Sequence, residues 1–204
     1  MSKLETANTT IIRPARELDL GRRQMFRVAG VTTLSAAAVA ILGGCKSTSA
    51  TTMASEGDVN TLNVALGLEH EAINAYQLGA ESGLLQKPVL DVAVLFQSHH
   101  KQHRDALVAA IQSMGGMPVA EKSKNDYAKE LNASTLKSQA DVLMLAAKLE
   151  KGAANAYLGV IPAFDSKDLG QVAARLAADE TMHWTVLASA LKQALPEKAL
   201  SFGA

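Results

Sequence analysis

Hydrophobic residues recur at steps of three and four along four long stretches of the chain, which is the period of an amphipathic helix. The pattern predicts helices over 58–85, 88–114 and 168–195, and a further helix that begins near Asn132 or Ser134 and ends near residue 160. Gly or Pro residues follow these stretches and are typical helix stops. The alternation of a half-buried β-strand is not found, so the sequence predicts an all-α domain.

Residues 117–133 connect the second and third predicted helices. This segment is polar, contains Pro118, and is longer than the two to eight residues that usually join the helices of a bundle. A connection of this length crosses a bundle from end to end and lets two helix pairs run parallel. We therefore expect a four-helix bundle made of two helical hairpins.

The two predicted hairpins share a sequence repeat. Residues 68–76 align with residues 149–157, with Leu, Glu, Ala, Asn, Ala and Tyr in register. A histidine follows the aligned glutamate after 34 residues in the first copy and after 33 residues in the second. The repeated pairs are Glu69 with His103, and Glu150 with His183.

Six ionisable residues occupy positions where the helical stripes call for hydrophobic side chains. Burial of an unpaired charge costs several kcal/mol. Two divalent metal ions would compensate, because carboxylates and neutral imidazoles are metal ligands. Glu180 and His183 lie three residues apart on one helical face, where they can hold one ion together. The expected ligands are Glu69, His100, His103, Glu150, Glu180 and His183.

In these motifs the sequence resembles the ferritin-like superfamily over about residues 58–195. It is also similar to exported ferritin-like domain proteins of unassigned function. Bundles of this superfamily hold a carboxylate-bridged di-iron or di-manganese centre, to which two helices each contribute a Glu and the other two each contribute a Glu-x-x-His motif. Glu69 and Glu150 match the single glutamates, and Glu180 with His183 matches one complete motif.

The other Glu-x-x-His motif departs from the family pattern, because His100 stands where the Glu before His103 is expected. The ligands would then be three Glu and three His, with one negative charge fewer. The resemblance implies iron, whereas imidazole also suits zinc and copper, and manganese occurs in the family. The opposing interpretation is a bundle that has lost its metal and keeps a buried polar cluster.

Several residues next to the expected ligands have two interpretations. Tyr76 and Tyr157 follow the repeated glutamates by seven residues, and we expect their hydroxyl groups to bond either a ligand carboxylate or another core acceptor. His70 lies about 100° round the helix from Glu69, and we expect it to be exposed. We leave His99 outside the ligand set, although a rotated helix would bring it in.

Residues 1–44 have the layout of an export signal, in which a basic segment precedes an uncharged run of 17 residues. The pair Arg22-Arg23 resembles a twin-arginine signal. The box that ends at Cys45 resembles a lipobox, whose cysteine is acylated. With residues 45–57 as a flexible tether, we expect a lipoprotein of the cell envelope or periplasm. The alternative is an uncleaved anchor, although the run is shorter than the about 20 residues of a spanning helix.

The charge balance limits the classes of partner. Residues 1–44 hold six basic and three acidic residues, and the rest of the chain holds 14 and 17. No basic stripe remains, so nucleic-acid binding has no electrostatic support. Cys45 is the sole cysteine, which excludes a disulfide within the chain.

Two functions are compatible with the sequence. The first is a di-metal oxidoreductase that oxidises Fe(II) or removes peroxide, with metal ions and oxygen or peroxide as partners. The second is a non-catalytic envelope lipoprotein whose helical module binds metal or a partner. A homodimer is compatible with the sequence, whereas the tail over 196–204 offers no further helix for a storage cage.

Overall fold

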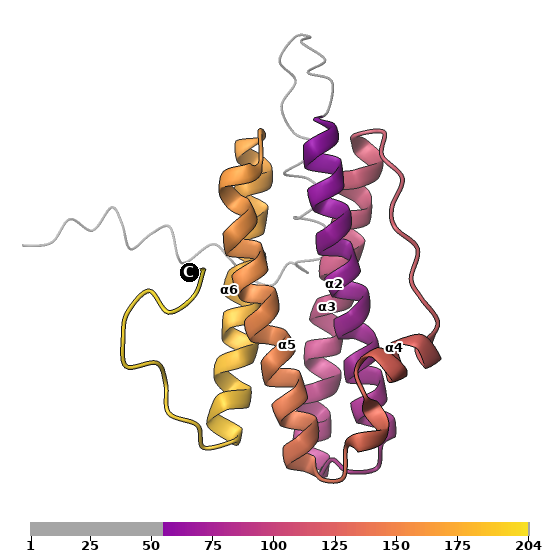
Figure 1. Cartoon of the computed structure of the whole chain (residues 1–204), viewed down its shortest axis with the longest axis vertical. Helices are drawn as coiled ribbons and strands as arrows, with labels where there is room; N and C mark the ends of the chain where they lie inside the picture. The colour runs from indigo at the N-terminus through magenta and orange to yellow at the C-terminus, as the bar shows by residue number, and fades with distance from the viewer. Residues whose placement is uncertain (1–54, 204) are drawn as a thin grey trace, which may run out of the picture. The chain divides into compact units, whose positions relative to one another are not determined.

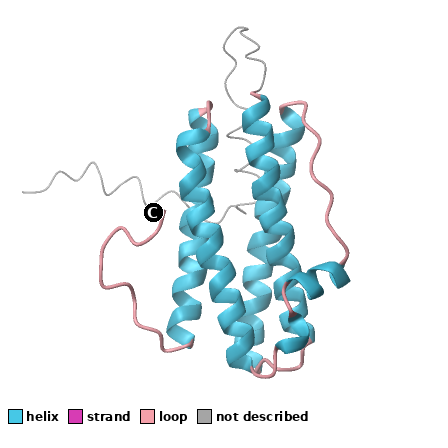
Figure 2. Ribbon diagram, viewed as in Figure 1, coloured by secondary structure: helices cyan, strands magenta, loops and turns pink. Residues whose placement is uncertain are grey.

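Four long helices form a bundle over the part of the chain that the structure, a computed structural model, describes, residues 55–203 (Figure 1). The long helices are α2 (Glu56–Glu81), α3 (Lys87–Ser113), α5 (Gln139–Val160) and α6 (Lys167–Ala190). The short helices are α4 (Lys124–Glu130), η2 (Ala133–Thr135) and η3 (Ile161–Ala163). Figure 2 shows helices and loops, and no strand, over residues 55–203. The predicted all-α bundle is confirmed.

The predicted N-terminal features fall mostly outside the described residues. The export signal over 1–44, the lipidation site Cys45 and all but the last three residues of the tether over 45–57 lie there, and they stay predictions. Among the helices of residues 55–203, none combines the length and the apolar character needed to cross a lipid bilayer.

The long helices pair as two hairpins. α2 packs on α3, α5 packs on α6, and α2 also contacts α5. The crossover between α3 and α5 runs down the side of the bundle from one end to the other, so these two helices point in the same direction (Figure 1). The expected arrangement of two hairpins joined by a long crossover is therefore confirmed.

Several helix ends differ from the predicted ones. α2 stops four residues early, just before Gly83 (φ +71°), and α6 stops five residues early, just before Lys192 (φ +56°). A left-handed residue cannot continue a right-handed helix. α5 begins only after Ser138, whose side chain accepts a hydrogen bond from the backbone N–H of Asp141. The crossover itself contains α4 and η2, which the sequence pattern did not predict.

Two apolar clusters fill the bundle on either side of a polar layer. One cluster includes Leu66, Leu107 and Leu176, and the other includes Phe96 and Trp184. On each long helix, the expected metal ligands lie between residues of the two clusters. The fold therefore places ionisable side chains in the middle of a hydrophobic core.

Candidate metal centre

The six predicted ligands lie together in the centre of the bundle. α2 contributes Glu69, α3 contributes His100 and His103, α5 contributes Glu150, and α6 contributes Glu180 and His183. His103, with 7 % of its surface exposed, is the most accessible of the six, and Glu180 and His183 are fully buried. Burial of charged groups is unfavourable unless they are paired, so opposite charges or bound cations must lie beside these carboxylates.

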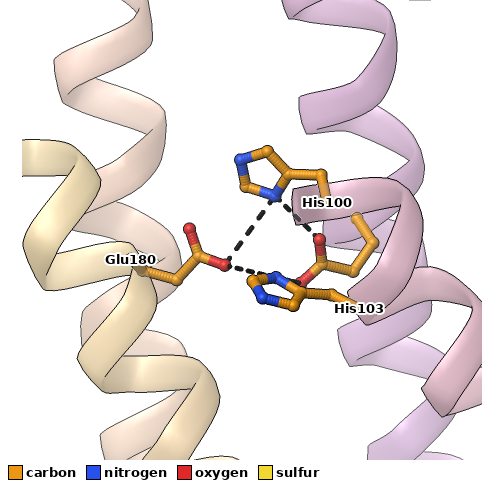
Figure 3. A group of neighbouring side chains, drawn as sticks. His100, His103 and Glu180 are labelled. Atoms are coloured by element: carbon orange, nitrogen blue, oxygen red, sulfur yellow. Dashed lines mark hydrogen bonds and ion pairs between the residues drawn. The ribbon is translucent and has the colours of Figure 1, made fainter. Parts of the chain in front are cut away.

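The six side chains form two overlapping groups of four. In each group, one potential ligand atom from every residue lies within 4.8 Å of the others. His100 and Glu180 belong to both groups, and Figure 3 shows them facing each other from α3 and α6 beside His103. The first group adds Glu69 and His103, and the second adds Glu150 and His183.

His100 lies between the two groups and turns one ring nitrogen towards each. Its Nδ1 lies 2.8 Å from Glu69 Oε2, and its Nε2 lies 3.2 Å from Glu150 Oε1. Glu180 has the same relationship through its carboxylate oxygens, since Oε1 lies 3.1 Å from His103 Nδ1 and Oε2 lies 3.4 Å from His183 Nδ1. The two shared residues thus connect the two halves of the cluster.

The outward nitrogens of the other two histidines have partners of their own. His103 Nε2 lies 3.2 Å from Asp179 Oδ2, and His183 Nε2 lies 2.9 Å from His99 Nδ1. These contacts orient the rings and keep both Nδ1 atoms directed inwards, as outer partners do for metal-binding histidines. Sequence reasoning missed Asp179, because it meets His103 only through the approach of α3 to α6. It left out His99, whose position beside His100 was the only signal.

Each buried tyrosine bonds the glutamate of the other hairpin. The Tyr76 hydroxyl donates to Glu150, and the Tyr157 hydroxyl donates to Glu69. Burial, and then the charge of the bonded carboxylate, raises the pKa of both tyrosines well above the usual value. Both hydroxyl groups therefore stay protonated and act as donors.

Three buried atoms of the cluster have no hydrogen-bond partner. They are both carboxylate oxygens of Glu180 and Nδ1 of His103, although His103 Nδ1 lies within ion-pair distance of Glu180 Oε1. An unsatisfied buried polar atom costs about 1–3 kcal/mol. Carboxylate oxygens and imidazole nitrogens are also the ligand types that iron, manganese, zinc and copper accept. The residues therefore fit a metal centre.

The histidines carry extra protons when no metal neutralises the carboxylates. Burial lowers the pKa of His100 and His103, but hydrogen bonds to nearby carboxylates outweigh it and raise the two values to about 10 and about 12. Burial raises the pKa of Glu69, but the hydrogen bond from His100 and the positive charge of His103, whose Nδ1 lies 3.6 Å from Glu69 Oε1, reverse this and lower it to about 2. For Glu180 burial prevails, and its pKa is raised. In the absence of metal, the two protonated histidines thus supply the positive charge that metal ions would supply.

His70 is buried, contrary to the expectation that it would be exposed. Its side chain is covered by the crossover, where Nε2 lies 3.3 Å from the Val119 carbonyl oxygen. Asn74 bonds the same segment through Glu121. The crossover packs on this face of α2, which the helical pattern alone could not indicate, and His70 lies outside both groups of the centre.

A four-helix bundle with three glutamates and three histidines at its centre defines a carboxylate–histidine bundle protein. The family model described as the ferritin-like domain matches residues 57–193, more than half of the chain, and the chain belongs to this family. The likeness to this family expected from the motifs is thereby confirmed.

Among the solved structures with a similar fold is one from a bacterium. It is the crystal structure of a conserved hypothetical protein from Mycobacterium tuberculosis, with 23 % sequence identity and a TM-score of 0.56. The match covers 70 % of this chain and 95 % of the other. At this identity the likeness supports the fold alone. No match is found among curated proteins.

Proposed function

We propose that the protein binds two metal ions in the centre of the bundle. Glu69 and His103 would hold one ion, and Glu150 and His183 would hold the other. His100 and Glu180 lie between these pairs. The two oxygens of Glu180 could ligate both ions, whereas neutral His100 could ligate one ion through one nitrogen and keep its proton on the other. The observation that carries the proposal is the pair of buried Glu180 oxygens, which have no hydrogen-bond partner and face histidines of both groups.

The charge of the cluster favours divalent ions. Three carboxylates offset three of the four positive charges of two divalent ions, so the buried site would be nearly neutral once His100 and His103 release their extra protons. Iron is the metal that the family resemblance favours, and manganese, zinc and copper share the ligand types. Metal binding should therefore release protons and strengthen as the pH rises.

The chain's own residues would prepare the site for redox chemistry. Tyr76 and Tyr157 hold the carboxylates of Glu150 and Glu69 in place, and Asp179 and His99 orient two of the imidazoles. Bound iron would supply the electron transfer to oxygen or peroxide. We therefore propose Fe(II) oxidation or peroxide removal as the activity.

The alternative is a non-catalytic module that binds metal or a partner. It is favoured by His100, which replaces a carboxylate in the shared position of the site and lowers its negative charge. Both functions require metal binding, but only the first requires turnover of oxygen or peroxide. Stable metal binding without consumption of oxygen or peroxide would support the module.

Anaerobic titration of the metal-free protein with Fe(II), followed by oxygen, tests the proposal. We expect two ions per chain and an absorption change on oxygen addition. Glu180→Ala should bind markedly less metal, whereas Glu81→Ala, at an exposed position of α2, should bind as much as wild type. A wild-type chain that binds no metal would overturn the proposal.

We also propose that the protein is exported and acylated at Cys45. The arginine pair Arg22-Arg23 supports this, because twin-arginine export carries folded proteins and would allow a metal to be loaded first. Fractionation of cells that express the full chain, with labelled fatty acid, tests the proposal. Wild type should carry label and sediment with membranes, and Cys45→Ala should lose the label. An unlabelled wild-type chain would contradict acylation.

A further inference from the structure

A cavity of about 160 Å³ lies in the half of the bundle between the metal centre and the α2–α3 connection. All four long helices line it. Pro88 of α3 and Val186 of α6 belong to its lining and are exposed, so the cavity meets the surface at these residues. The metal centre does not use this space.

Small residues on one face of α2 make room for the cavity. Ala72, Ala75 and Gly79 line it from this helix. The repeat aligns Gly79 with Val160, which packs against the apolar cluster on the other side of the centre. A Cβ atom on Gly79 would lie 3.0 Å from Val142 Cγ1. The second hairpin therefore carries a larger side chain at the position where the first has none.

The lining restricts the class of molecule that the cavity can hold. Its side chains are those of Ala, Leu, Val, Pro, Phe and Tyr, together with Gly. The sole hydroxyl group among them, that of Tyr76, already donates to Glu150. A polar ligand would lose its hydrogen bonds to water without replacement. An apolar protein cavity of about 150 Å³ stays dry and binds benzene or xenon, so the volume suits a compact apolar molecule.

The cavity shares a wall with the metal centre. The Tyr76 ring lines the cavity and stacks on His100 at a centroid distance of 5.4 Å. The Phe96 ring also lines it and stacks on His183 at 4.1 Å. A molecule in the cavity would thus lie one aromatic ring away from two histidines of the centre.

We propose that this cavity is a binding site for a compact, uncharged apolar molecule of about the size of benzene, held against Tyr76 and Phe96. Binding requires no metal, since none of the lining residues is an expected ligand. A reaction of the bound molecule at the centre would rest on the proposed function. The site is therefore testable separately from the metal.

Benzene is the probe, titrated into the metal-free full-length protein and followed by calorimetry and NMR. Ala75→Leu places a larger side chain in the cavity. Ala156→Leu is the matched control, because the repeat aligns Ala156 with Ala75 and both are partly buried. We expect saturable binding to wild type and Ala156→Leu, and binding at least about tenfold weaker to Ala75→Leu, because the filled cavity lacks room.

Absence of saturable benzene binding to wild type would overturn the proposal, and so would equal binding to Ala75→Leu. If Ala75→Leu does not fold, magnetisation transfer in wild type decides. Transfer from benzene to Ala93 and Phe96 supports the site, and transfer only to residues outside the lining overturns it. Metal titration of the same samples separates the two proposals. Metal binding without benzene binding would overturn the apolar site alone. Benzene binding without metal binding would overturn the proposed metal function alone.

Discussion

The hydroxyl group of Tyr157 on α5 donates a hydrogen bond to Glu69 on α2. The two residues belong to different copies of the sequence repeat, and the symmetric bond joins Tyr76 to Glu150. Each hairpin therefore holds the glutamate of the other. This exchange makes the geometry of the centre depend on the docking of the two hairpins.

Tyr157→Phe removes one of these bonds while keeping the ring. We expect the metal-free protein to lose about 1–3 kcal/mol of stability, because a buried carboxylate loses a donor. Metal affinity should fall about 10–100-fold, as it does when an outer partner of a ligand is removed. Denaturant unfolding and metal titration measure the two effects. Tyr127→Phe is the control, since Tyr127 is a buried tyrosine of α4 within the crossover and belongs to neither ligand group, and it should leave metal affinity unchanged.

His100→Glu restores the family's four-carboxylate pattern. In the metal-free protein it replaces a protonated imidazole by a carboxylate beside Glu69 and Glu150. These two buried carboxylates then lose the positive charge of His100. We expect a loss of about 3–5 kcal/mol without metal, and a larger stabilisation by divalent metal than in wild type. Melting temperatures with a chelator and with Fe(II) or Mn(II) measure this. Equal metal stabilisation of both proteins would contradict a ligand position for residue 100.

The metal-free protein should lose stability as the pH rises above 6.5. The pKa values of His100 and His103 are raised to about 10 and about 12, against about 6.5 in the unfolded chain. Between these values the folded state holds more protons, so the stabilisation is complete below pH 6.5 and is lost up to pH 10–12. Each histidine contributes a slope of up to about 1.4 kcal/mol per pH unit. Urea unfolding at pH 6.5, 8 and 9 checks this, and a rising stability would contradict it.

The acid side of the stability profile has the opposite slope. The pKa of Glu69 is lowered to about 2, so its contribution is present above the unfolded value of about 4.3 and is lost as the pH falls towards 2. Glu69→Gln should reduce this acid sensitivity and leave the part due to Glu150, whose pKa is raised by burial but lowered on balance by hydrogen bonds from His100 and His183. Unfolding curves of metal-free wild type and Glu69→Gln at pH 3 and pH 5 measure the difference in the free energy of unfolding. A wild-type stability that is equal at both pH values would contradict the ion pairs of Glu69.

Asp179→Asn removes the charged partner of His103 Nε2. The pKa of His103 should fall, because burial then opposes its charge with one carboxylate fewer. Metal affinity should fall about 10–100-fold through the looser ring. Histidine NMR and metal titration measure these effects. Asp91→Asn, which alters an exposed ion pair with Lys87, is the control and should change neither. Unchanged values in Asp179→Asn would show that the contact does not position His103.

The helical period and the repeat were enough to predict the bundle and its two hairpins. Glu69, Glu150, Glu180 and His183 stood out because ionisable residues replaced hydrophobic ones on an otherwise apolar face. Helix ends were less predictable. The early stop of α6 depends on the left-handed conformation of Lys192. Lysine has no preference for this conformation, so the sequence did not predict the stop.

The sequence by itself determined the elements and the residues that face the interior, because both follow from local periodicity along one helix. The tertiary structure alone decided which side chains meet across helices: the exchanged tyrosines, the contact between Asp179 and His103, and the crossover that covers His70. It also placed His100 between the two groups, with a nitrogen towards each. These relationships arise from packing between segments distant in the chain, and a periodic pattern carries no information about that packing.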